Sequence, residues 1–156
     1  MYILVFIPIE TLVPTYGILD FEFTWTPDRA ETILAVWGAQ GIFQETLAIF
    51  WDFLFIVGYV SLTFGLIVLV LRRSENKLQT IGLFMTITPF LTGIFDIIEN
   101  INLIVMLSNP TSILPVNPLM ASISALLKFG FLFAAIIYFV IALIIVLINK
   151  IKKKNK

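Results

Sequence analysis

Residues 119–148 read LMASISALLKFGFLFAAIIYFVIALIIVLI and continue directly into the tail NKIKKKNK at 149–156. A helix that crosses a bilayer needs about 20 consecutive, mostly apolar residues. This stretch is longer than that, and Lys128 is its one charged residue. It therefore predicts a transmembrane helix, and the lysine-rich tail predicts that its carboxyl end faces the cytoplasm.

The rest of the chain has the same character. Of 156 residues, 60% are hydrophobic and 13% are charged, whereas soluble domains carry about 25% charged residues. One water-facing core cannot hide this apolar surplus, so lipid must cover much of it. Two further long apolar stretches predict spanning helices, and the spans we expect are 46–71, 79–107 and 119–148.

A shorter apolar stretch begins the chain. Residues 2–19 are interrupted by Pro8, Glu10 and Pro14, but no basic residue precedes them as it would in a signal peptide. We predict a short, kinked first span here. The fold class is then all-α, a polytopic four-transmembrane-helix bundle forming one integral membrane domain over residues 1–156.

A short helix is predicted between the first two spans. Thr26 is a suitable N-cap, Pro27 fits the first helical position, and Gly38 suits the end. Trp25 and Trp37 flank the segment, and tryptophan favours the membrane–water interface. We therefore expect an amphipathic, outward-facing interfacial helix at about 27–37.

The basic residues define an orientation. Arg72, Arg73 and Lys77 lie between the second and third spans, and the remaining lysines outside the spans lie in the tail. The positive-inside rule places both regions, and both termini, in the cytoplasm of an inner-membrane protein. The acidic segment 20–45 and the loop 108–118 then face outward. Gly58, Ser61 and Gly65 form a small-residue face, which predicts close helix packing.

Ionisable residues within the spans form a candidate site. At about 1.5 Å per residue from the cytoplasmic boundary, Asp52 and Lys128 lie at about 28 Å, Asp96 at about 22 Å and Glu99 at about 27 Å. A hydrocarbon core is about 30 Å thick, so these four share the outer part of the bilayer. Polar stripes on the three helices extend the set. The predicted ligand-binding residues are Asp52, Asp96, Glu99, Asn100, Lys128, Tyr59 and Trp51, and Glu45 and Glu10 are further ionisable residues in or beside the spans.

Two interpretations of this cluster stay open. Lys128 pairs with a carboxylate and the network only fixes helix register, or the acids line an outward-facing pocket that binds or acts on a molecule. Three acids and one base leave a negative centre, which a proton, a metal ion or a cationic ligand would complete.

Several chemistries are disfavoured. The chain has no cysteine and no histidine, so thiolate sites and histidine-based catalysis are excluded. Carboxylates and amides suit hard metal ions, but we predict no metal and no cofactor. Asp52 and Asp96 lack the sequence contexts of an aspartyl intramembrane protease, and a Ser124–Lys128 dyad has no evident oxyanion site.

Two resemblances add to these observations. Tyr16-Gly-Ile-Leu-Asp-Phe-Glu-Phe, the Thr26-Pro-Asp-Arg-Ala start, Asp52-Phe53, Asp96-Ile-Ile-Glu99-Asn100 and Lys128-Phe129 resemble a group of small, uncharacterised bacterial four-helix membrane proteins. The layout alone is similar to EXPERA-type proteins, which include sterol isomerases and the sigma-2 receptor. That layout implies a lipid-like ligand and carries no residue roles.

The sequence thus favours a small membrane protein whose acid-lined pocket, in the outer half of the bilayer, binds or handles a lipid-like or amphipathic molecule, with a cationic molecule as one option. Binding alone and catalysis both fit such a pocket. The alternative is a non-catalytic accessory or structural subunit of a larger membrane complex. The expected partners are membrane lipids and either a second copy or a membrane-complex subunit, with no nucleic acid.

Overall fold

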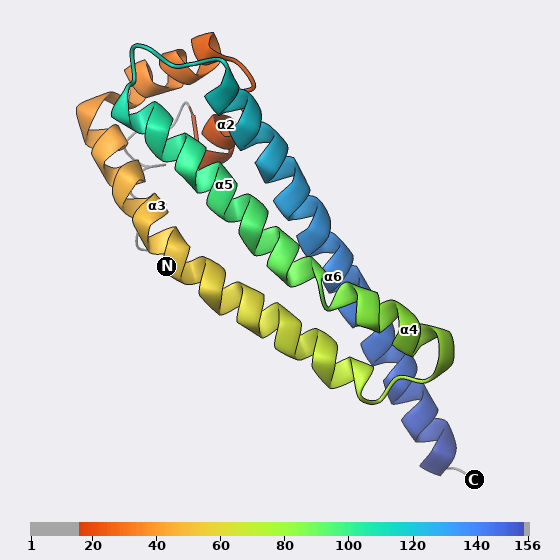
Figure 1. Cartoon of the computed structure of the whole chain (residues 1–156). Helices are drawn as coiled ribbons and strands as arrows, with labels where there is room; N and C mark the ends of the chain where they lie inside the picture. The colour runs from red at the N-terminus through yellow and green to blue at the C-terminus, as the bar shows by residue number, and fades with distance from the viewer. Residues whose placement is uncertain (1–15, 155–156) are drawn as a thin grey trace. The chain divides into compact units, whose positions relative to one another are not determined.

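The computed structural model describes residues 16–154, and in this part of the chain all regular structure is helical. The elements are α2 (Ile18–Glu22), α3 (Pro27–Leu71), α4 (Asn76–Met85), α5 (Thr88–Ser108) and α6 (Val116–Lys154) (Figure 1). Three stretches are long and apolar enough to cross a membrane: Pro27–Leu71, Asn76–Ser108 and Val116–Lys152. The predicted first span lies mostly in residues 1–15, outside the described residues, and Ile18–Glu22 forms the short α2.

A helix is present at the predicted residues 27–37, as the first part of α3, and we keep the name interfacial helix for it. Gly38 has φ 62° and ψ −174°, which interrupts the helix and separates 27–37 from 39–71 (Figure 1). Glycine has no Cβ, so it adopts this positive φ without the strain that other residues suffer. The helix of the second predicted span thus begins before residue 46, because Gly41 keeps helical geometry and only Gly38 departs from it.

The predicted span over 79–107 is present as an apolar helical stretch over Asn76–Ser108, with a break that the sequence analysis did not anticipate. The helix stops at Met85 and restarts at Thr88. Pro89 is the physical reason, because proline has no N–H to donate to the carbonyl of Met85 and its ring clashes with that carbonyl. The hydroxyl of Thr88 donates to the Met85 carbonyl instead, at 2.8 Å. Within this region Thr86 also donates to the carbonyl of Leu83, at 2.6 Å.

The described chain forms two compact units. The first comprises 16–56 and 95–126, and the second comprises 57–94 and 127–154. In the first unit the loop 109–115 joins α5 to α6 (Figure 1). Its core is formed by apolar residues of α2, the interfacial helix, α5 and α6: Phe21, Ile33, Leu34, Trp37, Leu103, Met106 and Ala121.

Polar and aromatic contacts hold the interfacial helix against the rest of the first unit. Trp37 donates its indole N–H to the carbonyl of Tyr16 at 3.0 Å, and its ring packs against Phe21 with centroids 5.1 Å apart. Glu31 accepts a hydrogen bond from the Ile113 N–H at 3.3 Å. The interfacial helix is therefore tied both to α2 and to the loop between α5 and α6.

Close packing in the second unit occurs at Gly82. A Cβ built on Gly82 would overlap the hydroxyl of Tyr138 and approach Leu71 Cδ1 to 2.7 Å. Gly58 and Gly65 differ: both are exposed, and no described residue lies within 4 Å of a Cβ built there. None of the described residues covers this face, so close helix packing at Gly58 and Gly65 stays a prediction.

The last helix is longer than predicted. It begins at Val116, before residue 119, and continues through Asn149 to Lys154, so most of the predicted tail is helical. Pro118 lies within its first turn, where a missing N–H costs no helical hydrogen bond.

Candidate functional site

The polar stripe of α5 is buried. Asp96, Glu99 and Asn100 are 4%, 0% and 3% exposed, whereas Ile97 and Ile101 of the same helix are 40% and 52% exposed. A water-soluble protein places its apolar side chains inside and its charges outside. The reverse pattern here fits a helix whose apolar side faces lipid and whose carboxylates are shielded from it.

The structure brings two of the predicted residues into direct contact. The side-chain amide of Asn100 on α5 donates a hydrogen bond to Asp52 Oδ2 on α3, at 2.8 Å. Asp52 is half-buried. A hydrogen bond to a carboxylate is stronger than one between neutral groups, so this contact fixes the register of the two helices and orients the Asp52 carboxylate within the first unit.

Glu45 lies on the same face of α3, two turns before Asp52. It is 0% exposed, and neither of its carboxylate oxygens has a hydrogen-bond partner among the described residues. Glu22 and Asp52 are acidic residues near it. The sequence placed Glu45 among the ionisable residues near the spans, but its position at a helix boundary kept it out of the predicted site.

Glu22 is a residue that the sequence pattern does not single out. It ends α2 and is 8% exposed, although its neighbours in the sequence suggested an outward-facing acidic segment. Its main-chain carbonyl accepts a hydrogen bond from the Ser122 hydroxyl at 2.8 Å, and the same hydroxyl accepts the N–H of Trp25 at 3.1 Å. Trp25 has a positive φ of 60°, so Ser122 of α6 stabilises an unusual backbone turn that holds Glu22 inward. No periodicity in the sequence signals this contact.

These acids have few basic counterparts in their own unit. Acidic residues in the described part of the first unit are Asp20, Glu22, Asp28, Glu31, Glu45, Asp52, Asp96 and Glu99. The single basic residue there is Arg29, and its Nη2 lies 3.6 Å from Asp20 Oδ1 at the surface. We call Glu22, Glu45, Asp52, Asp96 and Glu99 the carboxyl cluster. Its residues lie in a unit with a strong excess of negative charge.

Lys128 and Tyr59 belong to the second unit. Lys128 is half-buried, and its Nζ lies 5.0 Å from the centroid of the Phe129 ring, a distance at which an ammonium group is attracted to an aromatic face. Pairing between Lys128 and an acid of the first unit stays a prediction. Trp51, which precedes Asp52 in the sequence, is 49% exposed.

The first unit also has two surface cavities near the interfacial helix. One, of about 520 Å³, adjoins Gly38 and the loop residues Pro110 and Thr111. The other, of about 490 Å³, is lined by residues that include Tyr16, Asp28 and Arg29. Neither cavity is lined by a residue of the carboxyl cluster. Among the described residues no group of three or more acidic side chains is arranged to hold a metal ion.

Three helices long and apolar enough to cross a membrane, two of which bury carboxylates, are the pattern of a multi-pass helical membrane protein. No known protein family, curated protein or solved structure matches the chain. Its function must therefore be inferred from the carboxyl cluster itself.

Proposed function

We propose that this protein crosses the inner membrane four times and binds the cationic head of a lipid-like or amphipathic molecule at its carboxyl cluster, in the outer half of the bilayer. The proposal rests on Glu45, a fully buried carboxylate whose oxygens have no partner among the described residues. Asn100 would orient Asp52. Trp51, the neighbour of Asp52 in the sequence, is proposed as a further lining residue.

Most carboxyl groups of the cluster are buried, so their negative charges need to be neutralised. An isolated buried carboxylate is strongly unfavourable unless a proton, a metal ion or another cation neutralises it. The described part of the first unit offers Arg29, which pairs with Asp20 at the surface, and the first fifteen residues contain no lysine or arginine. An amine or quaternary ammonium head would supply the missing positive charge, while its apolar tail remained in lipid.

The charge distribution supports the proposed orientation. In the described part of the second unit, Glu75 is the one acidic residue, and the basic residues are Arg72, Arg73, Lys77, Lys128, Lys150, Lys152, Lys153 and Lys154. The acids gather instead in the first unit, with the interfacial helix and the loop 109–115. The positive-inside rule then places the Arg72–Lys77 turn and the end of α6 in the cytoplasm. The apolar stretch that precedes α2 in the sequence is the proposed additional span, which brings the amino terminus to the cytoplasmic side.

The test is a comparison of amphipaths that share one dodecyl tail. The protein is purified in a neutral detergent, and its melting temperature is measured as dodecyltrimethylammonium, a zwitterionic dodecyl analogue or a neutral dodecyl analogue is added as a minor component of the micelle. We expect a saturable rise with the cationic analogue alone. Equal stabilisation by the neutral analogue would show that only the tail is recognised.

Two variants sharpen this test. Glu45→Gln should weaken the response to the cationic analogue by about tenfold or more, because it removes a charge-assisted contact. It should raise the melting temperature without the analogue, since a neutral amide costs less to bury than a carboxylate. Asp28→Asn removes one acid that is exposed on the interfacial helix and should change neither quantity. An unchanged response in Glu45→Gln would contradict the proposal.

A second candidate function is that of a non-catalytic accessory subunit. The observation in its favour is the open face at Gly58, Ser61 and Gly65, which a helix of another protein could approach closely. Native mass spectrometry after mild solubilisation tests it. A second protein that remains bound, and is lost in Gly58→Leu and Gly65→Leu variants, favours this role; a chain that stays alone in both forms argues against it.

A further inference from the structure

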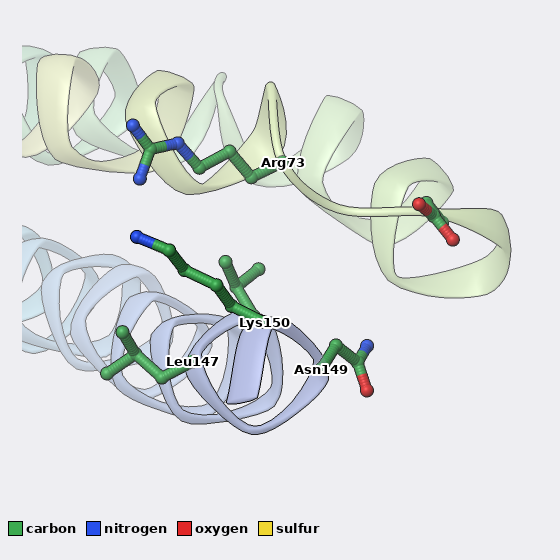
Figure 2. A pocket seen from close by; sticks show the side chains of 6 residues that line it. Arg73, Leu147, Asn149 and Lys150 are labelled. Atoms are coloured by element: carbon green, nitrogen blue, oxygen red, sulfur yellow. The ribbon is translucent and has the colours of Figure 1, made fainter. Parts of the chain in front are cut away.

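A basic cavity lies in the second unit, and none of its lining residues belongs to the carboxyl cluster. It encloses about 350 Å³ and is lined by Arg73, Glu75, Val146, Leu147, Asn149 and Lys150. Figure 2 shows that Arg73 and Lys150 come from facing walls of the cavity and direct their charged ends toward the same gap. Two like charges that face one gap repel each other, so an anion between them would be stabilised by both.

The two walls are held in place by specific contacts. The turn that carries Arg73 is closed by hydrogen bonds to the Val70 carbonyl, from the Arg73 N–H at 3.1 Å and from the buried Ser74 hydroxyl at 2.8 Å. About three turns before Lys150, Tyr138 anchors α6 to α4 by donating to the carbonyl of Leu78 at 3.1 Å. The backbone that carries Arg73 is therefore ordered before a ligand binds, which lowers the entropic cost of binding.

The charged side chains that line the cavity have one more positive than negative charge. Arg73 and Lys150 form no ion pair with a described residue, and Glu75 is the one acid in the lining. Two positive side chains and one carboxylate have a net charge of +1, which one phosphodiester would neutralise. Arginine binds phosphate oxygens through two parallel hydrogen bonds, and lysine adds a compact positive charge.

The position along the helices indicates that the phosphate belongs to a lipid. Arg73 follows the apolar part of α3 by two residues, and Lys150 follows the apolar run of α6 by two residues. Residues at these points lie where the hydrocarbon core meets the headgroups. Val146 and Leu147 supply an apolar wall one turn deeper, where the upper part of an acyl chain would lie.

We propose that this cavity binds the phosphodiester headgroup of an anionic phospholipid, with Arg73 and Lys150 as the phosphate ligands. Basic pockets between transmembrane helices on the cytoplasmic side are suited to anionic headgroups. This inference is independent of the proposed function of the carboxyl cluster, because the two sites share no residue.

The test uses native mass spectrometry of the whole protein in a neutral detergent, titrated with phosphatidylglycerol or phosphatidylcholine of equal chain length. The Arg73→Gln/Lys150→Gln double variant should bind phosphatidylglycerol about tenfold or more weakly than the unmodified protein, because each cation contributes a charge-assisted contact. The matched control is Arg72→Gln/Lys152→Gln, which removes the same charge from neighbouring exposed positions that do not line the cavity. It should retain most of the affinity.

Three results would overturn the proposal. Equal losses in the two double variants would show that the basic end attracts anionic lipid without a defined site. Equal affinity for phosphatidylcholine would show that negative charge is not recognised. Displacement of phosphatidylglycerol by inorganic phosphate at millimolar concentration would identify the free anion as the ligand. Glu75→Gln should leave the affinity for phosphatidylglycerol unchanged or raised, and a loss in that variant would contradict the assigned charge balance.

Discussion

Gly82→Ala should destabilise the second unit. The new Cβ would overlap the Tyr138 hydroxyl, lie 2.7 Å from Leu71 Cδ1 and lie 3.0 Å from Tyr138 Cζ. The rigid ring of Tyr138 must move away, which breaks its hydrogen bond to the Leu78 carbonyl. Overpacking costs about 1–3 kcal/mol and the lost hydrogen bond about 0.5–1.5 kcal/mol. Alanine recovers about 0.5–1 kcal/mol in helix propensity, so we expect a net loss of about 1–3 kcal/mol.

The assay is thermal unfolding in detergent, with Gly65→Ala as the matched control. Gly65 lies on a helix of the same unit with no described residue within 4 Å of a built Cβ, so its variant should be as stable as the original protein or slightly more so. Tyr138→Phe removes the overlapping hydroxyl. It should therefore lower the free energy of unfolding less in the Gly82→Ala variant than in the original protein. Equal stability of the Gly82 and Gly65 variants, or the absence of this coupling, would refute the close packing at Gly82.

Two further predictions address topology and the first unit. A cysteine at Asn76 should resist an impermeant thiol reagent in intact cells while one at Thr111 reacts, because the basic turn is assigned to the cytoplasm; the reverse pattern would invert the orientation. Asn100→Leu should cost about 1–3 kcal/mol in thermal unfolding, since it removes the donor to Asp52. Asn102→Leu is its control, because that amide bonds within α5, to Ile98; equal losses would contradict a role between helices.

Several elements of the fold could be predicted from the sequence because their causes are local. Hydropathy and length are sufficient to identify three long apolar stretches. The start of the interfacial helix at Pro27 and its end at Gly38 follow from the conformational preferences of proline and glycine. The burial of the stripe of Asp96, Glu99 and Asn100 follows from their helical spacing.

Other features depend on contacts that spacing does not encode. Pro89 is a local helix breaker, but the long apolar run around it favours one continuous span and conceals the break. Gly82 and Gly65 are chemically identical, and only the position of Tyr138 makes the first a close contact. Glu22 is buried because Ser122, one hundred residues later, holds its backbone. Such long-range contacts become visible only in the three-dimensional structure.

Native mass spectrometry of the protein, extracted from its own membrane, decides whether the carboxyl cluster holds a cationic amphipath around buried Glu45. We predict an amine-bearing adduct of lipid-like mass on the unmodified protein and on Asp28→Asn, and its absence from Glu45→Gln. An unmodified protein without such an adduct, or an adduct retained equally by Glu45→Gln, would contradict the proposed site.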